Sequence, residues 1–336
     1  MLGRKIIGID FGTSEVKIYR KGAGVVLKEK NVVAIKNRKK VIASGNFAYD
    51  MLGKSPEEIE VSMPIQNGVI ADVGKMQMLL STFIEKAFNG KKIKNADYLV
   101  AVPTDITEVE KRAFCDVIQR SNAKVRNIFM VDKPVSAALG MEIDVTGTRG
   151  VLTVDIGADT TEIAIISLGG IVLSKLIPVG GYKFDSLIQS AIRKKYNLIV
   201  GDKTAENVKI SLASAVEPGE EVIRVFGRDV LSGLPSEAMV STEMIYEAIN
   251  EQLTSVLSAI RVILERTPPE ISADIIRSGI YVTGGSAMIK NLKECIEAET
   301  NLKVNIADDA EYSVINGVGK ISEDYKLLKQ VAHAVR

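Results

Sequence analysis

The chain has 336 residues, 46% of them hydrophobic and 25% charged, which is typical of a soluble globular protein of one or two domains. A net charge of +1 argues against a generally basic nucleic-acid-binding protein, so no nucleic-acid partner is expected. One histidine and two cysteines argue against a zinc centre, a histidine-based triad and a disulfide scaffold, and no apolar run could span a membrane. We therefore expect a cytoplasmic protein.

The first pattern is the apolar run Ile6–Ile9, which enters an Asp-Phe-Gly-Thr-Ser turn and continues as a second strand. Gly12 lets the backbone approach a ligand closely, and the amides of Thr13 and Ser14 can cradle phosphate oxygens. Asp10 would face a phosphate-bound Mg²⁺ through water, because Mg²⁺ keeps much of its hydration. For this turn alone, an ordinary Asp-Gly hairpin is the alternative.

The same pattern returns 145 residues later, where the apolar run Val151–Val154 enters the turn Asp155-Ile156-Gly157. A later glycine also recurs at this offset, as Gly24 and Gly169. Two copies predict a duplicated α/β half in which each copy is a meander of three strands. The two turns could then face each other across a cleft, one holding the β-phosphate and the other the γ-phosphate.

Helical patterns follow each copy, so the fold class is α/β. The segment 107–121 begins with Thr107 and Glu110 at capping-box spacing and carries apolar residues on one face. That predicted face consists of Val109, Ala113, Phe114, Val117 and Ile118. Further helices are predicted at 76–88, at 132–142 with entry through Pro134, and at 242–266, where Pro268 and Pro269 end the pattern.

A third element combines a strand at 279–283 with a glycine-containing turn and a helix at 289–299. The turn is Gly284-Gly285-Ser286-Ala287-Met288. It would allow a nucleoside to pack closely against backbone, and the start of a helix favours negative charge. An ordinary strand-to-helix turn is the alternative.

Together these three elements resemble the actin-like ATPase superfamily, and longer stretches resemble the MreB family of bacterial actins. The resemblance covers essentially residues 5–320. Its motifs are MPIQNGVIAD at 63–72, ITEVEKRA at 106–113, TEIAIISLGGIVLSK at 161–175, IRKKYNL at 192–198, TAENVK at 204–209 and TPPEISADII at 267–276.

The resemblance implies an actin-like fold of two lobes around an ATP cleft, each lobe with a duplicated core and a smaller subdomain. The implied core subdomains are 1–31, 70–145 and 318–336 (IA), and 146–180 and 241–317 (IIA). The implied small subdomains are 32–69 (IB) and 181–240 (IIB). It also implies ATP and Mg²⁺ as cofactors, slow ATP hydrolysis coupled to head-to-tail self-assembly, and a location at the inner face of the cell membrane. The implied partners are cell-wall synthesis and shape-determining membrane proteins.

The resemblance also assigns roles to individual residues. Glu110 would position the attacking water, although it is equally the third residue of the predicted capping box. Asp155 would join Asp10 in facing Mg²⁺ through water, and Thr160 and Thr161 would complete the catalytic set. The implied nucleotide-binding residues are Gly12, Thr13, Ser14, Glu15, Lys17, Gly157, Ala158, Asp159, Thr160, Glu206, Asn207, Val208, Lys209, Gly284, Gly285, Ser286, Ala287 and Met288.

Among these, Glu206 and Lys209 would contact the ribose and adenine. From the residues alone, they read instead as an exposed Glu–Lys pair at helical spacing.

Four positions depart from the family pattern, and one of them is Lys17, where MreB proteins usually have an apolar residue and actin has a lysine. MreB proteins usually have three glycines in the second phosphate loop, where this chain has Gly157, Ala158 and Asp159. Asp159 adds a carboxylate near a polyanion, and we hypothesise that Lys17 compensates for it across the cleft. The alternative is that Lys17 is a solvent-facing strand residue. Ser286 replaces the third glycine of the adenosine motif.

A basic loop at 88–94, with Lys91, Lys92 and Lys94, could bind weakly to an anionic membrane or be a solvated connection. Other functions remain open on the same fold. One is a non-filamentous, nucleotide-switched adaptor or pseudo-ATPase, which the altered loop favours. A small-molecule kinase is a weaker alternative, because 336 residues leave little room for a substrate-binding insertion.

Overall fold

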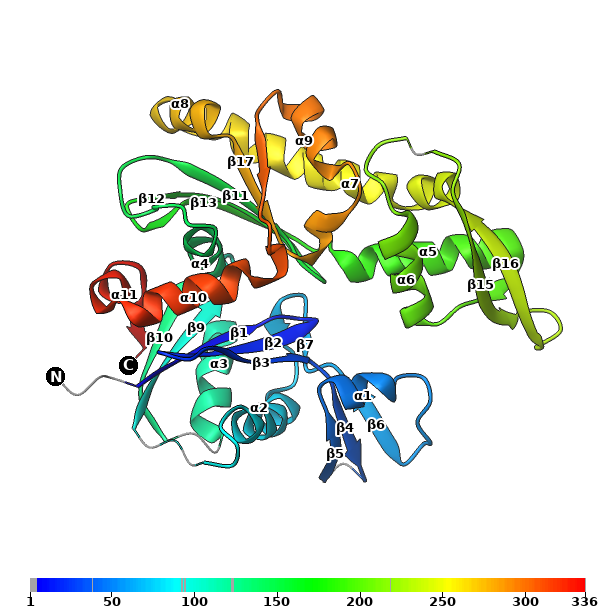
Figure 1. The fold of residues 1–336 in the computed structure, drawn as a ribbon, viewed down its shortest axis with the longest axis horizontal. Coiled ribbons are helices and arrows are strands. Elements are labelled where there is room, and N and C mark those ends of the chain that lie inside the picture. Colours follow the sequence, from blue (N-terminus) through cyan, green and yellow to red (C-terminus); the bar gives the residue numbers. More distant parts are fainter. Residues whose placement is uncertain are drawn as a thin grey trace. The chain divides into compact units, whose positions relative to one another are not determined.

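The computed structural model describes residues 5–37, 39–91, 93, 95–121, 124–217 and 219–335. The described chain divides into two compact units (Figure 1). Unit 1 takes in the residues up to Thr153, Ala164–Ser174 and the residues from Glu311 onward, and unit 2 takes in Val154–Ile163 and Lys175–Ala310. The finer division into four subdomains stays a prediction.

Unit 1 contains a mixed sheet with the strand order β19-β10-β9-β1-β2-β3. Parallel pairing joins β1 to β9 and β9 to β10, while β1, β2 and β3 form an antiparallel meander. The strands are β1 (Ile6–Phe11), β2 (Glu15–Arg20), β3 (Gly24–Lys30), β9 (Ala96–Val102), β10 (Val125–Asp132) and β19 (His333–Val335).

Helices cover both faces of this sheet, with α2 and α3 on one side and α4 and α10 on the other (Figure 1). Ile7, Ile9 and Phe11 alternate along β1 and belong to the core cluster that includes buried residues of α2 and α3. A side chain on Gly8 would collide with Val318 of α10, so glycine is needed for this close packing. The helices are α2 (Val73–Ala87), α3 (Glu108–Arg120), α4 (Lys133–Gly140), α10 (Ser313–Glu323) and α11 (Tyr325–Val331).

The predicted capping box is confirmed, because Thr107 caps α3 and exchanges hydrogen bonds with Glu110. The predicted apolar face is wrong at one residue: Val109 is 80% exposed. It lies in the first turn of α3, which is exposed at its start, while the contact with the core begins further along the helix. Periodicity gives the face of a helix but not where its neighbours end.

Shorter elements complete unit 1. One small sheet has the order β5-β4-β6, and β7 pairs with β8. The elements are β4 (Val33–Lys36), β5 (Lys40–Ser44), α1 (Asn46–Asp50), β6 (Ile59–Ser62), β7 (Ile65–Gln66) and β8 (Val69–Ile70).

The second copy of the sequence repeat forms three strands, as the first copy does and as the repeat predicts. Another sheet has the order β13-β12-β11-β17-β18, with β11 (Val151–Ile156), β12 (Thr161–Ser167), β13 (Gly170–Ile177), β17 (Ile280–Thr283) and β18 (Val304–Ile306). Strand β11 begins and ends 145 residues after β1. The matched glycines both have positive φ, 81° at Gly24 and 77° at Gly169, which glycine adopts without steric cost.

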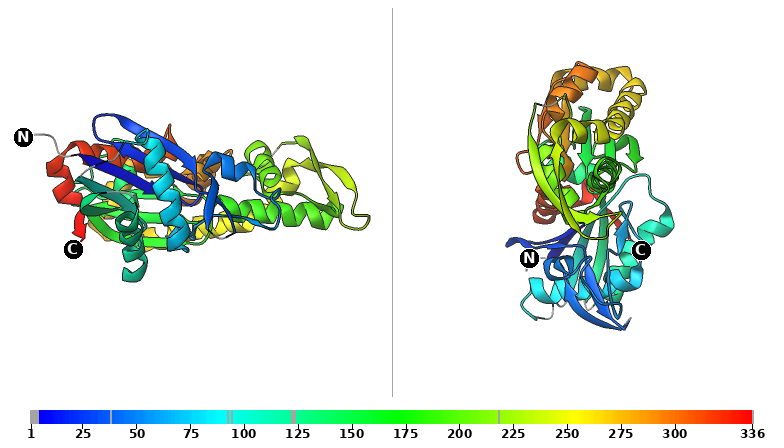
Figure 2. Two further views of the ribbon diagram at one scale, coloured as in Figure 1. Left: turned by 90° about the horizontal axis from the view of Figure 1, so that it is seen from below. Right: turned by 90° about the vertical axis from the view of Figure 1, so that its right-hand side faces the viewer.

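In unit 2, α5 packs against α6 and α7, and a small sheet with the order β14-β15-β16 packs beside α5 and α6 (Figure 2). The predicted end of α7 before Pro268 is confirmed. The predicted helix at 289–299 instead begins at Leu292, because Gly285–Met288 forms a 3-10 turn.

The elements of unit 2 are α5 (Gly181–Tyr196), β14 (Leu198–Ile199), α6 (Asp202–Leu212), β15 (Val222–Asp229), β16 (Pro235–Ser241), α7 (Thr242–Glu265), α8 (Pro269–Ser278) and α9 (Leu292–Thr300). A further 3-10 turn spans Ala310–Tyr312. Within the part of the chain that the structure describes, no helix is both long and apolar enough to cross a bilayer.

Candidate functional site

The first glycine turn, between β1 and β2, is held in shape from the end of β3. Asn31 is fully buried, its side-chain amide donates to Gly12 O at 3.0 Å, and its backbone amide donates to Ser14 O at 2.8 Å. A side chain on Gly12 would approach Glu15 O to 2.5 Å, so the tight turn requires glycine. Two bonds from one buried residue therefore fix the backbone that the sequence predicts as a phosphate cradle.

Asp10 lies just before this turn and is 6% exposed. Lys133, the first residue of α4, places Nζ 3.6 Å from Asp10 Oδ1 and donates to Phe11 O at 3.2 Å. Among the described residues, Asp10 Oδ1 accepts no hydrogen bond. A buried carboxylate oxygen without a donor suits the water ligand of a hydrated cation.

The described residues contain no group of three or more metal-binding side chains. Mg²⁺ commonly binds through one or two carboxylates, waters and substrate phosphates rather than a protein cage. The geometry around Asp10 therefore fits an ion held mainly by water and phosphate.

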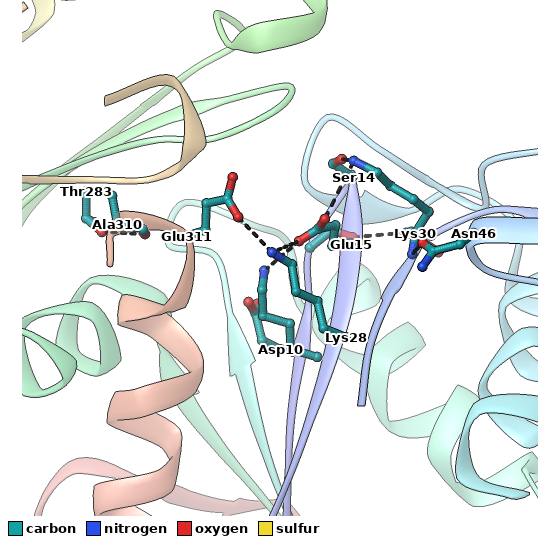
Figure 3. Close-up of polar contacts among 12 residues, drawn as sticks. Asp10, Ser14, Glu15, Lys28, Lys30, Asn46, Thr283, Ala310 and Glu311 are labelled. Atoms are coloured by element: carbon teal, nitrogen blue, oxygen red, sulfur yellow. Dashed lines mark hydrogen bonds and ion pairs between the residues drawn. The ribbon is translucent and has the colours of Figure 1, made fainter. Parts of the chain in front are cut away.

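A cluster of lysines surrounds Glu15 at the start of β2. The nearest Glu15 carboxylate oxygen lies 3.4 Å from Lys17 Nζ, 3.4 Å from Lys28 Nζ and 3.5 Å from Lys30 Nζ. Figure 3 shows Glu15 between Lys28 and Lys30. Burial opposes ionisation of Glu15, but the three lysines together hold its pKa below the ordinary value. Several cations around one carboxylate leave excess positive charge beside the turn, which suits a polyanionic ligand.

The cluster extends to Glu311, which accepts a hydrogen bond from Lys28 at 2.7 Å, and the Lys28 ammonium lies 4.7 Å from the centre of the Tyr312 ring. Lys17 is only 6% exposed. The alternative that Lys17 is a solvent-facing strand residue is therefore wrong. The Lys17 ammonium lies beside the Glu15 carboxylate and 5.9 Å from the centre of the Tyr312 ring, so it faces these side chains and not water.

Glu110 fulfils its predicted capping role. Its Oε2 accepts hydrogen bonds at 2.7 Å from both the backbone amide and the hydroxyl of Thr107. These bonds lower the pKa of Glu110, which makes it a weaker base and keeps it charged. Such a carboxylate is better suited to orienting a water molecule than to removing its proton.

The second glycine turn, in unit 2, has the same internal bond as a tight hairpin turn: Gly157 N donates to Thr160 O at 2.9 Å. Its residues 157 and 158 are then fixed to the start of α5, where Gly181 N donates to Gly157 O at 3.0 Å. A side chain on Gly180 would meet the backbone of Ala158 at 2.7 Å, so the loop and the helix are in direct contact.

The two threonines after this turn differ in environment. Thr161 is fully buried, and its hydroxyl donates to Val179 O at 2.7 Å. Thr160 is half-buried, as are Asp155 and Asp159. Of the two hydroxyls, only that of Thr160 is therefore placed to meet a ligand from solvent.

Helix α6 presents Lys209 toward α5, in contrast to an exposed Glu–Lys pair. Its Nζ lies 2.9 Å from both carboxylate oxygens of Asp185 and donates to Gly181 O at 3.1 Å. The alternative is therefore wrong for Lys209, whose side chain is 13% exposed. Val208 is part of the core, while Asn207 is exposed and Glu206 half-buried.

The turn at 284–288 packs against the second glycine turn. Gly284 has φ of 90°, and a side chain there would collide with Asp155 and Ile156. Ser286 donates its hydroxyl to Gly157 O at 3.1 Å. Ala287 is buried, whereas Gly285 and Met288 are exposed.

A family model described as MreB/Mbl protein matches residues 4–330. The chain belongs to the MreB/Mbl family. The cell shape-determining protein MreB of Escherichia coli K12 is 38% identical over 94% of this chain and 93% of its own length. The cell shape-determining protein Mbl of Bacillus subtilis 168 is also 38% identical, over 93% of this chain and 94% of its own length.

Solved structures agree with this assignment. The crystal structure of MreB5 of Spiroplasma citri bound to ADP has a TM-score of 0.90 at 38% identity and covers 97% of this chain and 98% of its own. The form bound to AMPPNP has a TM-score of 0.89 at 37% identity, with the same coverage of both chains. The MamK double helical filament, at 21% identity and a TM-score of 0.79, covers 96% of this chain and 99% of its own and shares the fold. The predicted actin-like α/β fold and the predicted family are confirmed.

Sequence reasoning missed three residues around the candidate site: Asn31 and Lys133, which support the first glycine turn, and Asp185, which holds Lys209. Lys133 carried a weak signal, since it precedes Pro134 at a predicted helix start. Asn31 and Asp185 carried none, because each acts on segments far away in the sequence.

Proposed function

We propose that this MreB/Mbl protein binds ATP and Mg²⁺, assembles head to tail into filaments and hydrolyses ATP slowly in step with assembly. The observation that carries the proposal is the pair of matched glycine turns, each held by specific hydrogen bonds. The structures of MreB5 bound to ADP and AMPPNP support it, since that protein is 37–38% identical to this chain.

In this proposal the backbone amides of both turns hold the phosphates, and the lysines around Glu15 supply the opposing charge. Asp10 and Asp155 would hold a hydrated Mg²⁺, which would neutralise charge developing on the phosphates. Glu110 and Thr160 orient the attacking water. Glu206, Lys209 and the turn at 284–288 hold the nucleoside.

The cellular role follows the relatives, which are named cell shape-determining proteins. We propose that the filaments organise cell-wall synthesis together with shape-determining membrane proteins, on the cytoplasmic side at the inner face of the cell membrane. We expect no nucleic-acid partner. Weak binding to anionic lipid through the 88–94 loop also stays a proposal; of its three lysines, Lys92 and Lys94 lie outside the described residues, and Lys91 is exposed.

The test is to follow purified protein with ATP and Mg²⁺ by light scattering and negative-stain microscopy, with phosphate release recorded on the same sample. Filaments with slow phosphate release are the expected result. ATP binding without filaments, in every salt and lipid condition, would contradict the filament role.

That second outcome would favour a nucleotide-switched, non-filamentous adaptor. The observation behind this alternative is the loop Gly157-Ala158-Asp159, which offers a side chain and a negative charge where the family resemblance implies glycine. Filaments that form without phosphate release would instead support the cytoskeletal role and would indicate that the altered loop prevents hydrolysis.

A further inference from the structure

Three distant segments of unit 2 meet at Gly181, the first residue of α5. A side chain at this position would lie 3.1 Å from Lys209 Nζ, 3.2 Å from Ser286 Oγ and 3.8 Å from Ala158 Cα. The backbone of Gly181 already bonds two of these segments, because its carbonyl accepts from Lys209 and its amide donates to Gly157 O. Glycine therefore leaves room for the residues proposed to hold the nucleoside to meet the phosphate loop.

One turn further along α5, Asp185 faces the same lysine. It is 7% exposed, and both of its carboxylate oxygens lie 2.9 Å from Lys209 Nζ. With Gly181 O as the third contact, the ammonium is held from the α5 side in a defined place. A lysine stem has four rotatable carbons, so without Asp185 this head group would sample many positions.

We infer that Asp185 is a positioning residue of the nucleotide site, which holds Lys209 in place and so couples α6 to the phosphate loop through Gly181. The inference rests on the proposed function, because Lys209 is assigned to the nucleoside there. Asp185 itself acts through Lys209 and is not assigned a contact with the ligand.

The electrostatics of the pair favour a functional over a stabilising role. Burial raises the pKa of Asp185 to about 6, and the nearby Glu206 and Asp202 raise it further, while Lys209 only partly offsets them. The buried carboxylate has lost most of its hydration, so its charged form is less favourable here than in water. Strongly shifted pKa values cluster at functional sites, so the shift agrees with the geometric argument for a positioning role.

The experiment is a double-mutant cycle read by calorimetric titration of ADP with Mg²⁺ at pH 7.5. Asp185→Asn keeps the shape of the side chain and removes its charge, and Lys209→Met removes the ammonium. We expect each single variant to weaken ADP binding about tenfold, the loss typical of a hydrogen bond to a charged group. In the Lys209→Met background, Asp185→Asn should have no further effect, whereas Asp185→Glu should retain part of the affinity.

A second pair of variants tests the junction by shape alone. Gly181→Ala would displace the ends of Lys209 and Ser286, and it should weaken ADP binding without lowering the unfolding temperature of the nucleotide-free protein by more than a few degrees. Gly201→Ala, at the N-cap of α6 with open space around it, is the matched control and should bind ADP like wild type.

Unchanged ADP affinity in Asp185→Asn, or an equal loss with and without Lys209, would overturn the positioning role while leaving nucleotide binding in place. Wild-type protein that does not bind ADP would overturn the proposed function and this inference with it. If Asp185→Asn fails to fold, Gly181→Ala decides: wild-type affinity in that variant overturns the coupling.

Discussion

Replacing Thr161 with valine separates a structural from a chemical role for the threonine pair. The Thr161 hydroxyl donates to Val179 O at 2.7 Å and is fully buried. Valine has almost the same shape, so no cavity forms, but Val179 O loses its donor. A buried polar group left without a partner costs about 1–3 kcal/mol. We expect the free energy of unfolding of the nucleotide-free protein to fall by that amount.

The measurement is urea unfolding followed by circular dichroism in the absence of nucleotide, where a lower midpoint with an unchanged slope reports lost stability. Thr160→Val is the matched control, because Thr160 is half-buried and exposed enough to meet a ligand. It should change the free energy of unfolding by no more than about 0.5 kcal/mol and should slow phosphate release. If Thr161→Val kept wild-type stability but released phosphate more slowly than wild type, this reasoning would be refuted.

Three further predictions use charge. Burial raises the pKa of Asp185 to about 6 from an ordinary 3.8, so its stabilising contribution is full below about pH 3.8 and is lost as the pH rises through 6. The difference in unfolding temperature between wild type and Asp185→Asn should therefore change between pH 5 and 7, with wild type losing stability relative to the variant. A difference that stays constant over this range would contradict the raised pKa of Asp185. Lys17→Met should weaken ATP binding about tenfold and AMP binding much less, because its charge lies beside the first turn; equal losses in titration would contradict this placement. Asp159→Asn should tighten ATP binding by about 1–2 kcal/mol, since a carboxylate near the phosphates is removed, and unchanged affinity would show that the charge is compensated.

Much of the fold could be predicted from the sequence because the duplicated half shows the same pattern twice. The turn at Gly12 alone could have been any Asp-Gly hairpin, but its copy at Gly157, with matched glycines at 24 and 169, identified two related meanders. Local rules also worked where all their participants are close in sequence. The capping box of α3 and the end of α7 before Pro268 are examples.

The surroundings of the candidate site could not be read in this way. Lys209 and Glu206 lie at a spacing typical of a surface ion pair, but the lysine turns to Asp185 in another helix. Lys17 lies in a strand whose pattern fits either face, and only the packed sheet shows that it is buried. Such outcomes depend on which distant segment fills a neighbouring position, and a single sequence carries no record of that.

The two glycine turns differ in what holds them, and this bears on the altered second loop. Asn31 supports the first turn, donating to Gly12 O from its side-chain amide and to Ser14 O from its backbone amide, and Lys133 lies beside Asp10. Backbone amides of α5 support the second, because Gly181 N donates to Gly157 O and Tyr182 N donates to Ala158 O at 2.7 Å, and the Ser286 hydroxyl adds a further bond to Gly157 O. Because these bonds use no side chain of the loop, alanine at 158 leaves them unchanged. The substitution therefore alters the space and charge offered to a phosphate and leaves the backbone that would receive it in place.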